Sequence, residues 1–423
     1  ANSINALTID PGAAGMVNQG MMRSDAGSTL ILTGSGGGAF DNTGGTLMAA
    51  GAGSIVSLTT NVDITGGTLT SSGGGIIESA ANQFVTLRNV ELSSGSQYIG
   101  RNNTFTFLEG TIINNGDIAL ASSGNLADIR INGDVALEGS GTVTMGDALN
   151  NRIVAFAIGD RLTVTENQVI QGSGQIGANT MSVTNDGLIV SNNAGSSLTL
   201  DPNNLGDITN NGILRADNDA VLVFSGSGGG AFDNTDGTIE AVNGGVVQLT
   251  LSADISGGLI ASDGGASLIE VAANQIATLR DVELGSGSQL IARNNTDLNL
   301  EGTITNNGDI ALASVGNATD IQLTGDVVLA GTGTVTLGDN NQNRIVANAT
   351  GNRLTVTAGQ VIQGSGQIGA NTMSVTNDGL IVSDNAGSTL TLDPSNAGGF
   401  TNNGTLRADN DAVLVFSGSG GGA

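Results

Sequence analysis

Three observations predict that this is an all-β protein, a right-handed parallel β-helix made of repeated coils. An 18-residue stretch at 214–231 returns unchanged at 406–423, and a looser copy occupies 22–39. Short alternating aliphatic runs, such as VLVF at 221–224, recur along the chain and are typical of strands. Turn pairs such as Asn-Gly separate these runs at roughly 20–25 residues, which is a solenoid spacing.

The repeat has a long period of 192 residues, which relates Arg23, Arg215 and Arg407 to one another. Residues 1–32 therefore read as the end of a preceding unit, 33–224 and 225–416 as full units, and 417–423 as the start of the next. We expect the chain to be one section of a longer array. A fixed period copied this closely indicates a solenoid before any other fold.

Each predicted coil begins at a turn and continues into a short strand. Asn115-Gly116 precedes residues 117–120, and Asn211-Gly212 precedes residues 213–216. These pairs can mark hairpins, but they recur at coil length, which favours bends between parallel strands. Glycine supplies the positive φ that a bend needs, and asparagine tolerates it. Stacked asparagines can also form hydrogen-bonded ladders. We expect eight or nine coils per unit, or roughly 40 Å at about 4.8 Å per coil.

The composition restricts the kind of core that the chain can form and the partners that it can bind. Glycine accounts for 68 of 423 residues and aromatic residues for 2%, so the predicted core is thin and aliphatic and no long helix is expected. There is no cysteine, which excludes disulfides and zinc-thiolate sites. The net charge of −26 argues against nucleic acid as a partner. No apolar run approaches the roughly 20 residues of a membrane span, so this section is not expected to insert into membranes.

The recurring pattern in TNNGILRAD, TNDGLIVS and INNGDIALAS resembles the repeats of filamentous-haemagglutinin-type adhesins and autotransporters. It is also similar to the giant repetitive surface proteins of environmental bacteria. The resemblance covers nearly the whole chain at the level of pattern. It implies an elongated, extracellular, β-helical surface protein, and it brings no receptor motif.

The glycine run at 34–39 and 226–231 suggests a phosphate-binding loop, but the chain contains no lysine and no helix follows the glycines. We interpret it as a tight corner where units meet. Asp217 and Asp219 follow Arg215, and Asp409 and Asp411 follow Arg407 in the same way. Alternate residues share a strand face, so these groups predict either a calcium site or an Arg–Asp pair on a solvated face.

Paired carboxylates could indicate a polysaccharide-active enzyme. The candidates are Asp117 with its copy Asp309, and Asp186 with its copy Asp378, all beside Asn and Gly. We interpret them as bend residues because of these neighbours. Every candidate is duplicated and aromatic sugar platforms are scarce, which argues against a catalytic site. We therefore assign no catalytic, cofactor-binding or metal-binding residues and expect no enzyme. Calcium is the one cofactor left open.

The sequence favours a structural filament or stalk on a bacterial cell surface. The alternatives are a multivalent adhesin module that binds glycans or calcium, and a polysaccharide-active enzyme. Expected partners are other copies of the chain, end to end or side by side, and cell-surface polysaccharide.

Overall fold

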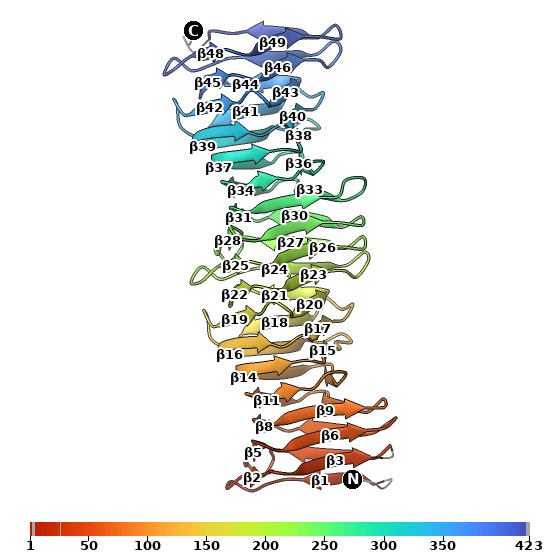
Figure 1. The fold of residues 1–423 in the computed structure, drawn as a ribbon. Coiled ribbons are helices and arrows are strands. Elements are labelled where there is room, and N and C mark those ends of the chain that lie inside the picture. The colour runs from red at the N-terminus through yellow and green to blue at the C-terminus, as the bar shows by residue number, and fades with distance from the viewer. Residues whose placement is uncertain (2–4, 26, 420–423) are drawn as a thin grey trace. The chain divides into compact units, whose positions relative to one another are not determined.

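The fold is a parallel β-solenoid, as the sequence predicts. The computed structural model describes residues 1, 5–25 and 27–419, and these contain strands and no helix. The chain divides into two compact units, Ala1–Leu214 with Gly228–Gly230, and Arg215–Ser227 with Ala231–Ala423. The division falls within β26 (Ile213–Ala216). Figure 1 shows the strands of each unit stacked in successive coils. The right-handed sense stays a prediction.

In the first unit, each strand pairs in parallel with the equivalent strand of the next coil, which gives three columns. The first column contains β1 (Leu7–Ile9), β4 (Thr29–Thr33), β7 (Ile55–Thr59), β10 (Ile76–Ser79), β13 (Gln97–Gly100), β15 (Asp117–Leu120), β17 (Thr142–Met145), β20 (Val169–Gly172) and β23 (Leu188–Ser191). The second contains β2 (Met16–Val17), β5 (Phe40–Asp41), β8 (Val62–Thr65), β11 (Phe84–Arg88), β18 (Asn151–Ala155), β21 (Gly174–Gly177) and β24 (Ser197–Leu200). The third contains β3 (Met21–Asp25), β6 (Thr46–Ala50), β9 (Thr68–Ser72), β12 (Glu91–Leu92), β19 (Arg161–Val164), β22 (Ser182–Asn185) and β25 (Ile208–Asn210). The long strands β14 (Thr104–Asn114) and β16 (Ala127–Glu138) run through the second and third columns.

The second unit also has three columns, which are numbered here within that unit. The first contains β27 (Val221–Ser225), β30 (Val246–Thr250), β33 (Leu268–Val271), β36 (Gln289–Ala292), β38 (Asp309–Leu312), β40 (Thr334–Leu337), β43 (Val361–Gly364), β46 (Leu380–Ser383) and β49 (Thr405–Ala408). The second contains β28 (Phe232–Asp233), β31 (Ala253–Ser256), β34 (Ile276–Arg280), β41 (Asn343–Ala347), β44 (Gly366–Ile368), β47 (Thr389–Leu392) and β50 (Val413–Phe416). The third contains β29 (Thr238–Ala241), β32 (Leu259–Ser262), β35 (Glu283–Leu284), β42 (Arg353–Val356), β45 (Ser374–Asn377) and β48 (Phe400–Asn402). The long strands β37 (Asp297–Asn306) and β39 (Thr319–Ala330) again run through two columns.

The alternation of residues along each strand places the aliphatic side chains inside. In β17, Val143 and Met145 are buried while Thr142 and Thr144 face outward, and most four-residue strands repeat this pattern. The interior is mainly Leu, Ile and Val, with Tyr98 and Phe40 among the largest buried side chains. The thin aliphatic core is therefore confirmed, because each coil contributes only a few inward positions.

Buried amides form the asparagine ladders that the sequence predicts. Asn185 Nδ2 donates to Asn210 Oδ1 at 2.7 Å, one coil along. Gln168, which is fully buried, donates to the carbonyl oxygens of Asn114 at 2.6 Å and Glu138 at 3.0 Å. The Asn114 carbonyl also accepts from the Gly141 amide at 2.8 Å, so the side-chain amide adds a second hydrogen bond to this turn.

Most turns are bends of positive φ between parallel strands, not hairpins. The positive-φ residues other than glycine are mostly Asn and Asp, including Asn103 (φ 59°) and Asn274 (φ 63°). Among the described residues, the strand pairs within each unit are parallel, and the antiparallel contacts are isolated bridges such as Gly12 with Gly37. The preference for bends over hairpins is confirmed.

The repeat does not contain a whole number of coils. In the second unit, eight pairing steps lead from β27 to β49 along the first column. Val413, the sequence copy of Val221, instead begins β50, which pairs with β47 in the second column. In the first unit, β24 copies β1 and is likewise one column further on. Each repeat is thus eight coils and one third, so copied strands occupy different faces.

This offset can be checked with gold labels on cysteines. Thr8 of β1 and Thr199 of β24 are equivalent in the repeat, and we expect gold on Thr8→Cys and Thr199→Cys to lie on different faces of the solenoid in cryo-electron micrographs. Thr8→Cys with Gln171→Cys is the control, because both residues lie in the first column. Gold particles aligned along one face in both pairs would contradict the one-third offset.

Candidate functional site

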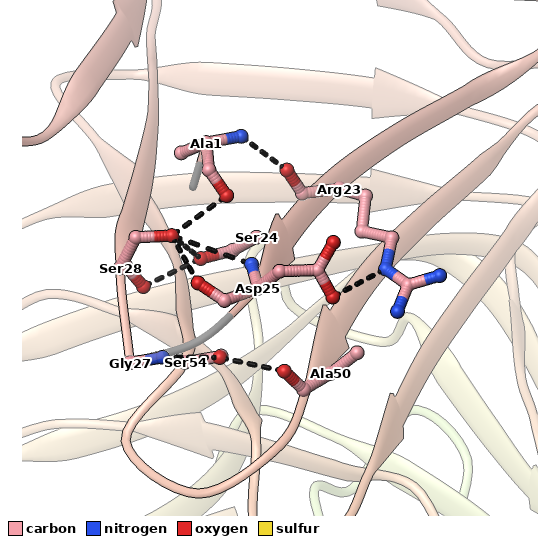
Figure 2. Close-up of polar contacts among 8 residues, drawn as sticks. All are labelled: Ala1, Arg23, Ser24, Asp25, Gly27, Ser28, Ala50 and Ser54. Atoms are coloured by element: carbon pink, nitrogen blue, oxygen red, sulfur yellow. Dashed lines mark hydrogen bonds and ion pairs between the residues drawn. The ribbon is translucent and has the colours of Figure 1, made fainter. Parts of the chain in front are cut away.

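The Arg–Asp motif forms ion pairs, but its partners differ between the copies. Arg23 Nε donates to Asp25 Oδ1 at 2.6 Å, a contact drawn as a dashed line in Figure 2. Arg407 pairs in the same way with Asp409 at 2.7 Å. Arg215 pairs instead with Glu240, at 2.6 Å. The residue beside Arg23 in the next coil is Met48, which is uncharged, so Arg23 pairs with Asp25 of its own strand.

The predicted shared face for Asp217 and Asp219 is wrong. Strand β26 ends at Ala216, and Asn218 and Asp219 adopt positive φ values of 55° and 56°, so the chain turns before Asp219. Asp217 accepts a hydrogen bond from Asn243 Nδ2 at 2.9 Å. The described residues contain no group of three or more metal-ligating side chains. The copy at 406–423 includes residues 420–423, which lie outside the described part of the chain.

Two of the four candidate carboxylates were misplaced by sequence reasoning. Asp117 and Asp309 are not in bends but begin β15 and β38, with side chains half-buried on the outer face. Asp117 accepts a hydrogen bond from Thr144 Oγ1 at 2.7 Å, and Asp309 accepts one from Thr336 Oγ1 at 2.8 Å. Asp186 and Asp378 do lie in turns, and each accepts from an asparagine of the next coil.

A shallow polar groove crosses the turns next to Asp117. Gly74, Ser96, Asn115 and Ser140 are among the residues that line it, and they come from successive coils. Asp117 is the only carboxylate among the described lining residues. The groove therefore lacks the second carboxylate that glycoside hydrolysis normally uses.

Asp309 gives a pH-dependent prediction. Burial raises the pKa of the Asp309 carboxyl, and the hydrogen bond from Thr336 opposes this rise. A raised pKa means that the folded state binds the proton more tightly, so stability falls as pH rises from about 3.9, the unfolded value, through the folded pKa. We expect Asp309→Asn to raise the urea midpoint at pH 7 and to leave it unchanged at pH 3. An equal gain at both pH values would contradict this linkage.

The glycine segment forms the predicted corner, and close backbone packing explains its composition. Residues 34–39 connect β4 to β5. Asp10 accepts hydrogen bonds from Ser35 Oγ at 2.6 Å and from the Gly36 amide at 2.7 Å. A Cβ on Gly36 would lie 2.5 Å from the Pro11 carbonyl oxygen, so only glycine fits there. These contacts hold the corner against the preceding coil.

An outward-facing cluster of aromatic side chains was missed by sequence reasoning. We define the aromatic surface as Phe84, Phe105, Phe107, Arg130 and Phe156, on the second column of the first unit. Phe84 and Phe105 are in register on adjacent strands, with ring centroids 5.1 Å apart. Phe107 contacts Phe156 edge to face at 5.4 Å.

Arg130 joins the two aromatic pairs. Its guanidinium carbon lies 3.9 Å from the centroid of Phe105 and 5.8 Å from that of Phe107. Phe84 and Phe156 remain 46% and 59% exposed. The only signal in the sequence was the alternating Phe105 and Phe107, because the other members come from different coils.

No family model matches the chain, and no curated protein matches it significantly. Among the described residues, no helix is long and apolar enough to cross a membrane.

Proposed function

We propose that this chain is a section of a structural filament or stalk on a bacterial cell surface. The observation that carries the proposal is that the repeat copies a buried hydrogen-bond network of amide side chains. Gln168 and Asn114 are joined by the same hydrogen bonds as their copies Gln360 and Asn306. A unit whose buried hydrogen-bond network is copied from one repeat to the next is suited to adding length.

The outer ion pairs support the same reading. Arg152 pairs with Asp128 at 2.7 Å, and the copied residues Arg344 and Asp320 pair at 2.5 Å. Both carboxylates are almost fully buried. Each repeat adds about 40 Å along the coil axis at the strand spacing of about 4.8 Å. The high net negative charge keeps such a surface soluble and disfavours nonspecific contact with anionic membranes.

Two measurements test the proposal. Antibodies raised against the purified chain are expected to label the outside of intact cells of the source organism in immunogold electron microscopy. Recombinant chains with one or two added repeats are expected to lengthen by about 40 Å per repeat in electron micrographs. Labelling confined to the interior of sectioned cells would contradict a surface role.

A further inference from the structure

The aromatic surface is present in only one of the two full repeats. The positions that match Phe84, Phe105, Phe107, Arg130 and Phe156 are occupied by Ile276, Asp297, Asn299, Gln322 and Asn348. The strands that carry these residues pair in the same register in both repeats. The aromatic side chains are therefore not required by the coil, because the same coil forms without them.

The charges on this face differ between the repeats in the same direction. Around the aromatic surface, three arginines contact three carboxylates: Arg88 pairs with Asp63 and Glu109, and Arg130 and Arg152 pair with Asp128. The ion-paired groups of this face are thus balanced in charge, and a further carboxylate beside Phe156, Asp160, accepts from the Ala157 and Gly133 amides.

The matching face of the second repeat has two arginines and four carboxylates: Arg280, Arg344, Asp254, Asp297, Glu301 and Asp320. The excess negative charge acts on Asp297: burial raises the pKa of its carboxyl most, and the charge of Asp320 raises it further. The second repeat thus presents an acidic, polar face where the first presents a neutral, aromatic one.

We propose that the aromatic surface pairs side by side with the same surface on a second copy of this chain. Exposed aromatic residues with arginine are the composition of protein–protein interfaces and of their most important contacts. Two chains of charge −26 repel each other, so copies can approach closely only where acidic groups are matched by arginine. The aromatic surface meets this condition, and two identical balanced faces form a self-complementary pair.

The size of the surface is that of a small interface. Together with the ion pairs around it, it spans five adjacent strands of the second column, from β8, which carries Asp63, to β18. Five strands at about 4.8 Å and three outward residues per strand cover on the order of 500 Å² per copy. Two copies bury about 1,000 Å², the lower limit for a specific interface. We therefore expect a reversible dimer with a dissociation constant in the micromolar range.

Sedimentation velocity of the whole chain, from about 1 μM to about 1 mM, tests the pairing. The wild-type protein is expected to shift from monomer to dimer over this range. The variant Phe105→Asp, Phe107→Asn, Arg130→Gln and Phe156→Asn is expected to remain monomeric, with an apparent dissociation constant raised at least tenfold. Each new residue already occupies the matching position of the second repeat, so the variant should fold, which circular dichroism and thermal melting will verify.

The control variant is Val315→Ser. Val315 is 82% exposed and its counterpart in the first repeat is Ser123, so this change removes an exposed apolar side chain elsewhere and should leave the dimer intact. A wild-type chain that stays monomeric throughout, or a dimer that survives the fourfold change, overturns the proposal. Saturable binding of a neutral polysaccharide by a chain that remains monomeric would assign the surface to a glycan instead. These outcomes leave the stalk proposal untouched, because it depends on the repeat and not on lateral pairing.

Discussion

Gly172→Ala is expected to destabilise the first unit by about 3–5 kcal/mol. Gly172 ends β20 with a φ of 118°, a conformation that only glycine adopts readily. A Cβ at this position would also overlap the carbonyl oxygen of Met145 in the preceding coil. The carbonyl belongs to a strand paired with β20, so the overlap can be relieved only by breaking that pairing. Urea unfolding followed by circular dichroism measures the loss.

Two other glycines separate the causes of this effect. Gly195 has a φ of 72° but no atom within 4 Å of an added Cβ, so Gly195→Ala should cost only the backbone strain of about 1–2 kcal/mol. Gly20 has open space and no positive φ, so Gly20→Ala should change stability by about 0.5 kcal/mol or less. The copy Gly364→Ala should reproduce the large loss, since Gly364 has a φ of 112° and lies against Leu337. Equal losses of stability at all of these positions would show that the overlap with the preceding coil does not cause the loss at Gly172.

Transfer of the aromatic surface to the second repeat is expected to convert dimers into larger oligomers. The graft consists of Asp297→Phe, Asn299→Phe, Gln322→Arg and Asn348→Phe. It gives each chain two association surfaces, so pairing no longer ends at two copies. Removal of Asp297, whose pKa is raised by burial and by Asp320, should not lower stability. Sedimentation velocity at about 100 μM, well above a micromolar dissociation constant, should show species beyond the dimer.

A second graft identifies which surface is responsible for the association of the chains. When the graft is made in the chain that lacks the original aromatic surface, one association surface remains, now in the second repeat. That chain should return to a monomer–dimer equilibrium. If the grafted chain forms only dimers when the original surface is present, the aromatic residues are not sufficient for pairing.

Most of the fold could be predicted because its signals are local. The alternation in VLVF at 221–224 sets which side chains point inward, and the strand observed there, β27, has that burial pattern. Asn-Gly and Asp-Gly pairs mark the bends, because the required positive φ restricts the residues that can occupy them. Stacking of parallel coils then follows from the coil-length spacing.

The candidate sites were harder to predict than the fold, because their contacts involve residues from other coils. Arg215 was expected beside Asp217, but its partner is Glu240, 25 residues along the chain. Asp117 was interpreted as a bend residue because it follows Asn-Gly, yet it begins a strand and accepts from Thr144. The aromatic surface draws on β11, β14, β16 and the end of β18, and nothing in the sequence brings these segments together.

The sequence by itself determined the coil, its inward residues, its turns and the length of the repeat, because each depends on short-range chemistry that is copied along the chain. Only the tertiary structure decided which outer residues meet and on which face each copy lies. The face on which a copied strand lies depends on the summed length of all the coils in the repeat. Strand β14 turns a corner at Leu108–Gly110 without an Asn-Gly or Asp-Gly pair, which counting such turns cannot detect. That unmarked corner helps to make the repeat eight coils and one third.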